Sequence, residues 1–316
     1  MLSVIIPAYN EQENISAASQ RLGEILLPVT DYELIFVDDG SKDRSWEIIS
    51  DLAENDSHIR GLRFSRNFGK EGAIFAGLKA ATGDCVAVID CDLQHPPELL
   101  PKMYAAWQGG AEVVEAVKAS RGKESLIYKL FAKSFYRMMK SSSNINLDGA
   151  SDYKLMDRKV VDALNEMPER LTFFRALSSW VGFTTERIQF DVAPRNAGKT
   201  KWSFKKLFKF ALSSITSFTN LPMQIITVTG VLFFIFAVIL GIQTIVNFCL
   251  GNSASGFSTV ILLLLIIGSI LMLGIGIIGY YLSKIYEEIK CRPRYIVAQE
   301  AGTPRKKDTE ADERNN

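Results

Sequence analysis

Two aspartates in alternate positions, Asp90 and Asp92, end the apolar run that begins at Val86. Such a β-branched run is typical of a buried strand in a parallel sheet, and ligands bind at the carboxyl ends of these strands. Two carboxylates held there repel each other unless a cation or rigid donors compensate. Pro96 and Pro97 then fix the start of the next helix. The spacing predicts a site for a divalent cation carrying a diphosphate; the alternative is a turn with capping aspartates.

A second acidic strand end comes earlier, where the apolar run 32–37 stops at Asp38 and Asp39 before the turn residues Gly40 and Ser41. Further strands are expected at 2–6, where Pro7 ends the run, and at 59–64, 113–117 and 185–190, with helices ending near 27, 53, 81 and 165. Strands that alternate with helices predict an α/β fold with a doubly wound, mostly parallel sheet.

Dinucleotide-binding and P-loop proteins are excluded by their missing glycine loops. A nicotinamide or flavin domain needs GxGxxG directly after its first strand, but the loop here reads PAYNE. The GxGxxG at 274–279 lies inside a long apolar run, where small residues favour helix packing instead. We therefore expect acids and a metal ion to hold any nucleotide.

Cations follow the predicted strand at 113–117. Lys118 and Arg121 come directly after it, and Lys129, Lys133 and Arg137 then recur every four residues, which puts them on one helix face. This face is either solvated or binds an anion at a membrane surface.

A second basic segment, residues 195–202, combines Arg195 and Lys201 with a glycine turn. This combination predicts a phosphate-binding site; a solvated basic loop is the alternative.

A dense polar patch covers residues 151–158, just before the helix expected at 159–165. Asp157 is placed to cap that helix. Asp152 lies too early for capping, so it is a candidate for chemistry.

Two long segments, 223–250 and 257–283, contain no charged residue. Each exceeds the roughly 20 residues that a membrane-spanning helix needs; a buried helix pair of a soluble protein is the alternative. Lysines and arginines flank their outer ends, whereas the loop 251–256 has none, which predicts that both ends are cytoplasmic. Residues 203–221 combine an apolar arc with lysines, as in a helix that lies in the membrane interface.

These segments predict four parts. They are a cytoplasmic catalytic domain over 1–202, an interfacial helix over 203–221, a two-helix transmembrane hairpin over 222–286 and a cytoplasmic tail over 287–316, with a basic surface stretch at 291–295 and a disordered end. The first residues enter a strand at once and carry no basic leader, so we expect no cleaved signal peptide and a multi-pass protein of the cell membrane.

The composition narrows the partners. The net charge is +1, which indicates no nucleic acid partner. The 4 cysteines form no CxxC pair, so neither a zinc site nor a disulfide framework is predicted.

With these residues placed, the chain resembles family 2 glycosyltransferases of the GT-A fold, and more narrowly the polyprenyl-phosphate glycosyltransferases such as dolichyl-phosphate mannose synthase and bactoprenol glucosyl transferase. The matching segments are VIIPAYNE, VDDGSKD, FSRNFGKEGA, DCDLQHPPEL, SDYKLMDRKVVDAL, RNAGKTKW and the apolar hairpin with its RPRY tail. They are spread over nearly the whole chain.

The resemblance implies a role for each matching position. Pro7, Tyr9, Glu11, Val37 and Asp39 would hold the nucleoside of the donor, and Lys70, Asp90 and Cys91 would complete the nucleotide-sugar site. Asp92 and Gln94 would bind Mg²⁺ or Mn²⁺, with Asp152 as the catalytic acid/base residue. Lys118, Arg121, Lys129, Lys133, Arg195 and Lys201 would surround the diphosphate and the lipid phosphate.

The chain departs from the family pattern at three positions. Lys118 and Lys154 stand where arginine is usual, and lysine binds phosphate as a point charge rather than as a fork. His95 stands where aspartate is common, and either a structural role or metal ligation would fit it.

The resemblance implies inverting transfer of a sugar to polyprenyl phosphate. UDP-glucose or UDP-N-acetylglucosamine are the favoured donors; formamido-arabinose and mannose are alternatives. A processive polysaccharide synthase would need more spans and a QxxRW motif, which the sequence lacks. A catalytically silent membrane scaffold is a further alternative, and Gly279-x-x-x-Ser283 permits helix association in a homo-oligomer.

Overall fold

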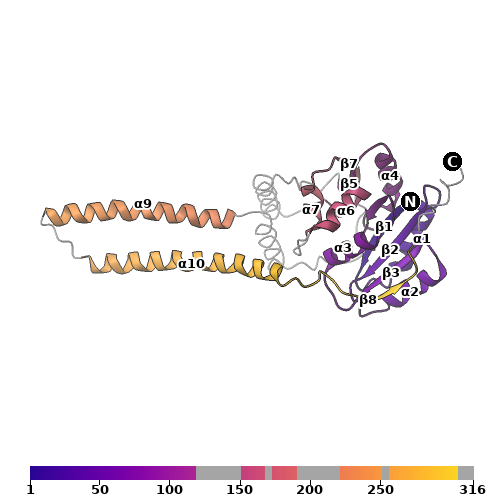
Figure 1. Ribbon diagram of the computed structural model, residues 1–316, viewed down its shortest axis with the longest axis horizontal. Helices are drawn as coiled ribbons and strands as arrows, with labels where there is room; N and C mark the ends of the chain where they lie inside the picture. The colour runs from indigo at the N-terminus through magenta and orange to yellow at the C-terminus, as the bar shows by residue number, and fades with distance from the viewer. Residues whose placement is uncertain (119–150, 168–172, 191–220, 251–255, 305–316) are drawn as a thin grey trace. The chain divides into compact units, whose positions relative to one another are not determined.

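The computed structural model describes residues 1–118, 151–167, 173–190, 221–250 and 256–304 (Figure 1). The described chain forms two compact units. One contains residues 1–118, 151–190 and 293–304, again without 168–172, and the other contains the long helices between 221 and 292. The predicted interfacial helix at 203–221 and the two basic segments lie almost wholly outside the described residues.

The first unit is built on an 8-stranded sheet in the order β7-β5-β6-β4-β1-β2-β3-β8. The strands are β1 (Leu2–Ala8), β2 (Tyr32–Asp38), β3 (Ile59–Phe64), β4 (Cys85–Val88), β5 (Val113–Lys118), β6 (Lys154–Asp157), β7 (Thr185–Phe190) and β8 (Val297–Ala301). The pairs β1–β2, β1–β4, β2–β3 and β5–β7 are parallel, whereas β6 pairs antiparallel with β4 and β5, and β8 with β3. The predicted mostly parallel α/β sheet is confirmed.

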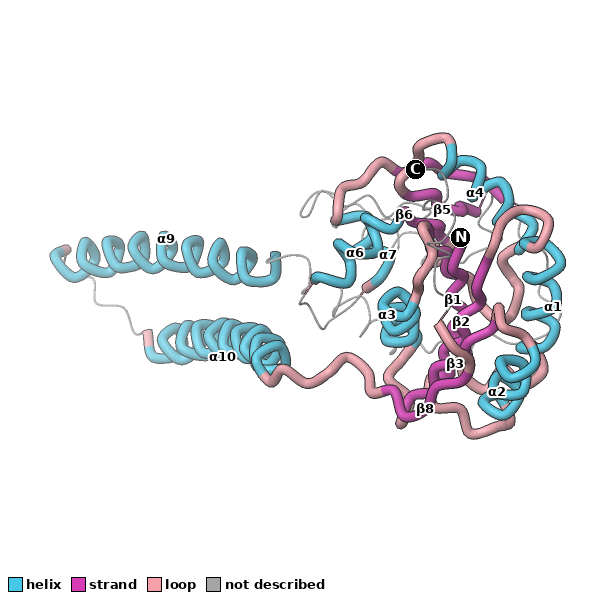
Figure 2. Tube along the Cα trace, turned by 45° about the vertical axis from the view of Figure 1, so that its right-hand side comes forward, coloured by secondary structure: helices cyan, strands magenta, loops and turns pink. Residues whose placement is uncertain are grey.

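Helices cover both faces of this sheet (Figure 2). They are α1 (Ile15–Leu26), α2 (Ser45–Asn55), α3 (Lys70–Ala80), α4 (Leu100–Gln108), α6 (Arg158–Glu166) and α7 (Phe174–Trp180), with a 3₁₀ turn η1 at Pro97–Leu99. Helices α1, α2 and α4 lie on one face, and α3, α6 and α7 on the other. Because both faces are covered, the central strands are buried along their length, and all seven residues of β2 are buried.

The first strand runs past the proline that was expected to end it. β1 continues through Pro7 to Ala8, while the paired part of β4 stops at Val88, opposite Ile5. Ile5 and Pro7 present their backbone groups to the β4 side, since alternate residues of a strand face the same neighbour. Pro7 therefore lies beyond the last β4 pair, where a missing N–H breaks no ladder bond.

Two strands were not predicted. β6 lies within the segment interpreted as a polar patch, and β8 lies in the segment interpreted as a tail. β6 fills the gap between β4 and β5, with Lys154 opposite Val88. Since β6 is antiparallel to β4, the residues before Lys154 lie beyond the carboxyl end of β4.

The chain returns to the sheet after the second long helix. Tyr295 stacks on Phe64, with ring centroids 5.1 Å apart, and β8 then pairs with β3. The Arg294 guanidinium lies 4.8 Å from the Phe75 ring centroid and also donates to the carbonyl of Met167. The prediction of a basic surface stretch at 291–295 is therefore partly wrong, because Arg294 and Tyr295 pack against the sheet domain.

The second unit consists of α9 (Leu221–Cys249) and α10 (Phe257–Ile289). Within these helices the segments Met223–Asn247 and Ile266–Ile289 are long and apolar enough to cross a membrane, and their described side chains are mostly exposed. Large side chains such as Phe234, Leu264 and Met272 are exposed. This exposure suits helices that face lipid better than the buried core of a soluble protein.

A glycine on α3 controls how closely this helix approaches β1. A Cβ atom on Gly77 would lie 2.3 Å from Ile5 Cγ2, inside the packed core. We expect Gly77→Ala to lower the free energy of unfolding by about 1–3 kcal/mol, because overpacking outweighs the gain in helix propensity. Thermal unfolding of the purified full chain in detergent measures this loss.

Gly72→Ala is the matched control on the same helix. The nearest atom to its added Cβ is 3.5 Å away, an ordinary contact. This variant should equal or exceed the wild-type stability, and equal stability of both variants would show that the α3–β1 contact is not tight.

Candidate active site

The carboxyl edge of the sheet collects the acidic strand ends predicted from the sequence. The chain leaves β4 at Ile89, whose N–H donates to the Ile5 carbonyl, and reaches Asp90 directly afterwards. β6 starts at the same edge because it runs antiparallel, which brings Asp152 near Asp90. These two carboxylates therefore meet although they are far apart in sequence.

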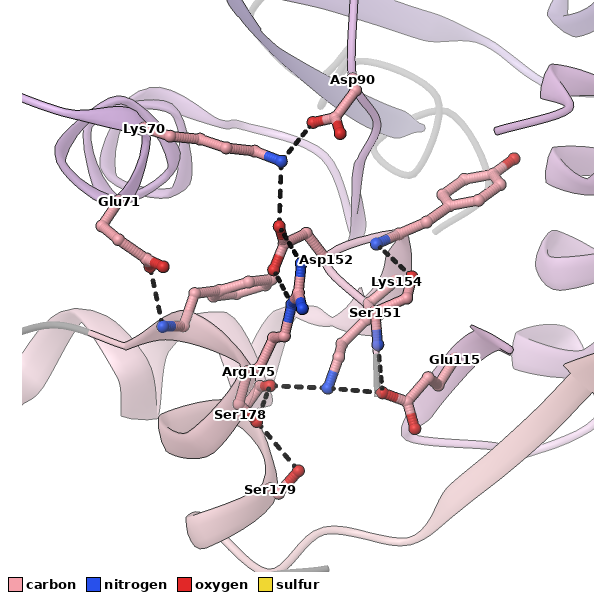
Figure 3. A network of polar contacts seen from close by, with 12 residues as sticks. Lys70, Glu71, Asp90, Glu115, Ser151, Asp152, Lys154, Arg175, Ser178 and Ser179 are labelled. Atoms are coloured by element: carbon pink, nitrogen blue, oxygen red, sulfur yellow. Dashed lines mark hydrogen bonds and ion pairs between the residues drawn. The ribbon is translucent and has the colours of Figure 1, made fainter. Parts of the chain in front are cut away.

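A chain of alternating charges connects them (Figure 3). Lys70, the first residue of α3, places its Nζ 2.5 Å from Asp90 Oδ1 and 2.9 Å from Asp152 Oδ2. Arg175 on α7 grips Asp152 from the other side, with Nε 2.6 Å from Oδ1 and Nη2 2.9 Å from Oδ2. The order in space is thus Asp90, Lys70, Asp152, Arg175.

The charges in this chain stabilise one another. Burial alone would favour the neutral form of Asp152, but the Arg175 hydrogen bonds and the Lys70 charge hold the pKa of that carboxyl well below its usual range. Burial likewise opposes the charged form of Lys70, yet Asp90 and Asp152 raise its pKa above the ordinary value. Both groups are therefore ionised at neutral pH.

Glu71 links the two helices that carry these cations. Its carboxylate on α3 accepts a hydrogen bond of 2.8 Å from the Phe174 N–H at the start of α7. Burial raises the pKa of Glu71 to about 7, and the neighbouring Asp152 charge acts in the same direction. The α3–α7 junction therefore contains a carboxyl group that titrates near neutral pH.

The turn after β4 presents Asp92 to solvent. Asp92 is exposed, its Oδ1 accepts from the Gln94 N–H at 3.1 Å, and Cys91 between the aspartates is 2% exposed. Leu93 adopts φ 51°, a left-handed conformation that costs energy for a bulky residue, and its N–H reaches the Asp90 carbonyl at 3.3 Å. Strain is thus stored in the loop expected to hold the metal.

Glu11 shares this acidic edge. Burial raises its pKa, and the charges of Asp92 and Asp90 raise it further, while a hydrogen bond from Asn14 lowers it. These three carboxylates therefore repel one another, and a divalent cation bound nearby would reduce this repulsion. Among the described residues, no three His, Cys, Asp or Glu side chains converge closely enough to enclose a metal ion by themselves.

The Asp39 carboxylate is bound by nearby backbone N–H groups. It is 4% exposed, and its carboxylate accepts from the N–H groups of Phe68 and Gly69 at 2.6–3.1 Å. Burial raises its pKa, and these backbone bonds oppose that shift. Asp39 thereby fixes the loop that leads into α3 and Lys70. Its predicted contact with the nucleoside stays a prediction.

The other predicted nucleoside-binding residues follow the same edge. Pro7 is half-buried at the end of β1, Tyr9 is 43% exposed, and Val37 is fully buried at the end of β2. Exposure makes Tyr9 available to a ligand, whereas the Val37 side chain packs in the core.

A family model described as glycosyl transferase family 2 matches residues 3–164. An uncharacterized glycosyltransferase of Synechocystis is 39% identical over 94% of both chains. A prophage bactoprenol glucosyl transferase homolog of Escherichia coli is 38% identical over 94% of this chain and 98% of its own. The bactoprenol glucosyl transferase of Shigella phage SfV is 36% identical over 95% of this chain and 98% of its own.

The chain belongs to glycosyl transferase family 2. The resemblance noted from the sequence is confirmed, and the protein is a glycosyltransferase. The matched residues 3–164 include most of the sheet and its acidic carboxyl edge.

Solved structures resemble this glycosyltransferase only weakly. Glucosyl-3-phosphoglycerate synthase from Mycobacterium tuberculosis, in complex with Mn²⁺ and UDP-glucose, has a TM-score of 0.46 at 22% identity, over 68% of this chain and 77% of its own. Staphylococcus aureus TarS 1–349 in complex with UDP-GlcNAc has a TM-score of 0.47 at 17% identity, over 68% of this chain and 65% of its own. These scores are too low to support an inference about the site.

Most predicted phosphate-binding cations of this glycosyltransferase lie outside the described residues: Arg121, Lys129, Lys133, Arg195 and Lys201. Lys118 is the last residue of β5, paired in register with Phe190 on β7. Their roles stay predictions.

Lys154 lies in the interior. It is 1% exposed, its Nζ is 3.0 Å from Glu115 Oε1, and it donates to Ser178 Oγ at 2.8 Å. Burial lowers its pKa, against the opposing charge of Glu115. Lys154, which stands where the family usually has arginine, therefore connects β6 with β5 and α7 through these buried polar contacts.

His95 faces the site from the loop before η1. Its ring centroid is 5.5 Å from that of Tyr153 and 5.7 Å from that of Phe190, and its Nδ1 lies 3.8 Å from Asp90 Oδ2. Tyr153 in turn donates to the Pro96 carbonyl at 3.1 Å. These contacts favour the structural role over metal ligation.

Arg175 is the site residue that sequence reasoning missed. No site residue was predicted in its part of the chain, and its partner Asp152 is 23 positions away. Within α7, Arg175 is the single charged residue, and this is the one local signal that could have drawn attention to it.

Glu71 makes the stability of this enzyme depend on pH. Because its folded pKa of about 7 is above its ordinary value of 4.5, the folded protein retains a proton that the unfolded chain releases. The resulting stabilisation is complete below pH 4.5 and is lost as the pH rises to about 7. Glu71→Gln stays neutral and should raise the unfolding temperature by a few degrees at pH 8, but not at pH 5.

The control is Glu54→Gln, at an exposed position on α2. Thermal unfolding of both variants from pH 5 to pH 8 checks the prediction. Curves parallel to the wild type for Glu71→Gln would contradict the assigned titration.

Proposed function

We propose that this protein transfers glucose from UDP-glucose to a polyprenyl phosphate such as undecaprenyl phosphate, with inversion at the anomeric carbon. The carrying observation is the near full-length similarity, at 36–38% identity, to proteins named bactoprenol glucosyl transferases. The lipid product would supply glucose for cell-envelope glycosylation.

The acceptor chemistry suits the charges at the sheet edge. A phosphate monoester has a second pKa near 6, so at pH 7 it is mostly a dianion and is nucleophilic without a strong base. The larger barrier is electrostatic, because a diphosphate and a lipid phosphate must approach each other. Lys70 and Arg175 already stand at this edge, and Lys118, Arg121, Lys129, Lys133, Arg195 and Lys201 are the further cations proposed to neutralise the two anions.

A divalent cation, Mg²⁺ or Mn²⁺, is proposed at Asp92 with help from Gln94. The exposed Asp92 carboxylate and its acidic neighbours fit such an ion, which in nucleotide sites commonly takes one or two carboxylates and completes its ligands with substrate phosphates. When bound, the ion would stabilise the leaving nucleoside diphosphate.

The proposed setting is the cytoplasmic face of the cell membrane. Helices α9 and α10 would form the spanning hairpin, and the positive charges outside their ends support a cytoplasmic location for both termini. The proposed parts are the catalytic domain 1–202, the interfacial helix 203–221, the hairpin 222–286 and the tail 287–316. The tail is not wholly separate from the catalytic domain, because β8 pairs with β3 of the sheet.

Other sugars are the main alternatives: N-acetylglucosamine, formamido-arabinose or mannose on the same lipid. A screen of radiolabelled nucleotide-sugars against membranes containing polyprenyl phosphate separates them by chloroform-extractable label. Label from UDP-glucose supports the proposal, and label only from another donor reassigns the sugar. A silent scaffold would give no lipid label and no metal-dependent nucleotide binding by calorimetry.

Asp92→Ala should abolish sugar transfer, because the proposed metal loses its carboxylate ligand and the donor diphosphate then loses the metal. It should also remove the Mn²⁺-dependent part of UDP binding in calorimetry. Turnover near the wild-type rate would overturn the metal assignment. Asp51→Ala, at an exposed aspartate on α2, is the control and should leave both measurements unchanged.

A further inference from the structure

Both carboxylate oxygens of Asp152 are already paired with cations. Its side chain is 9% exposed, its Oδ1 accepts from Arg175 Nε, and its Oδ2 accepts from Arg175 Nη2 and Lys70 Nζ. A carboxylate offers about four lone-pair sites, and three of them are used here by charged donors. Such a group is a poor proton acceptor and a strong anchor for the two cations.

The reaction in the proposed function supplies no task for a base at this position. A phosphate dianion carries no proton that must leave before it attacks. What the acceptor requires is a counter-charge held in a fixed position. A guanidinium, whose planar fork matches phosphate oxygens, is the side chain best suited to that requirement.

Arg175 lies at the end of the charge chain that is farther from the donor. Asp90, at the carboxyl end of β4, marks the donor side, and Lys70 lies between it and Asp152 (Figure 3). Arg175 approaches Asp152 from α7, and 39% of its side chain is exposed in spite of the ion pair. Arg175 is thus ion-paired with the nearly buried Asp152 and is still partly exposed to solvent.

Helix α7 is itself held at two points, so the position of Arg175 is fixed. The Phe174 N–H bonds to Glu71 at 2.8 Å, and Ser178 Oγ accepts from buried Lys154 at 2.8 Å. The side chains of Phe174 and Leu177 are at most 1% exposed. A cation on such a support is organised before any ligand arrives, which lowers the cost of binding.

We propose that Arg175 binds the phosphate of the lipid acceptor, and that Asp152 is the positioning residue that holds Arg175 and Lys70 in place. This inference rests on the proposed function. It replaces the acid/base role expected for Asp152 and adds a binding residue on α7.

The test is steady-state kinetics of the full chain in detergent, with UDP-glucose and undecaprenyl phosphate varied in turn. Arg175→Ala should lower kcat/KM for the lipid on the order of 10- to 100-fold, the effect of losing a charged hydrogen bond. The affinity for UDP, measured by calorimetry, should change less than about threefold, and Arg175→Lys should recover part of the loss. An unchanged lipid KM and kcat, or a loss of UDP affinity instead, would overturn the assignment.

A double-mutant cycle tests the role of Asp152. If Asp152 acts by holding Arg175, Asp152→Asn combined with Arg175→Ala should be no more than a few-fold slower than the slower single variant. If Asp152 is a proton acceptor, the two losses should multiply, and that outcome would refute the positioning role.

Arg187→Ala is the matched control. Arg187 is also 39% exposed and pairs with a buried carboxylate, that of Glu115 at 3.2 Å, but it lies on β7. It should retain the wild-type lipid kinetics, and a loss equal to that of Arg175→Ala would assign the effect to packing. The wild type distinguishes the two proposals: no lipid label from it defeats the proposed function, whereas an active wild type with an unaffected Arg175→Ala variant defeats this inference alone.

Discussion

A buried carboxylate must be neutralised, and the way Asp152 meets this constraint organises the catalytic edge. Its partners come from two different helices, Lys70 from α3 and Arg175 from α7, while Asp152 itself precedes β6. Removing either cation would leave the nearly buried Asp152 carboxylate with only part of its counter-charge, which would destabilise its ionised form. The ion pairs therefore fix the relative positions of α3, α7 and the segment before β6, which are far apart in the sequence.

The two ends of this charged edge differ in how their carboxylates are compensated. Around Asp92, the charges of Asp92, Asp90 and Glu11 repel one another, and the loop is strained at Leu93. Around Asp152, positive and negative groups already balance. This contrast suits the proposed reaction, in which the donor would bind together with a metal ion and the lipid phosphate would meet cations of the protein.

The sequence predicted the parts of this architecture that follow from local patterns. Apolar strands that end in aspartates could be recognised because period and turn chemistry are local properties, and the edge formed by β1, β2 and β4 followed from them. β6 escaped because its four residues begin with a lysine, whose burial depends on the Glu115 partner supplied by another strand. Arg175 escaped for the same reason: an ion pair across the fold has no signature in either segment alone.

The last strand of the sheet has a consequence for how the protein is made. β8 lies after both long helices in the sequence, yet it covers the outer edge of β3. During synthesis that edge stays unpaired until the second helix and the residues behind it have left the ribosome. Exposed edges invite pairing with other chains. Completion of the sheet is thereby tied to completion of α10, so a chain that stops before the end of this helix retains an open, association-prone edge.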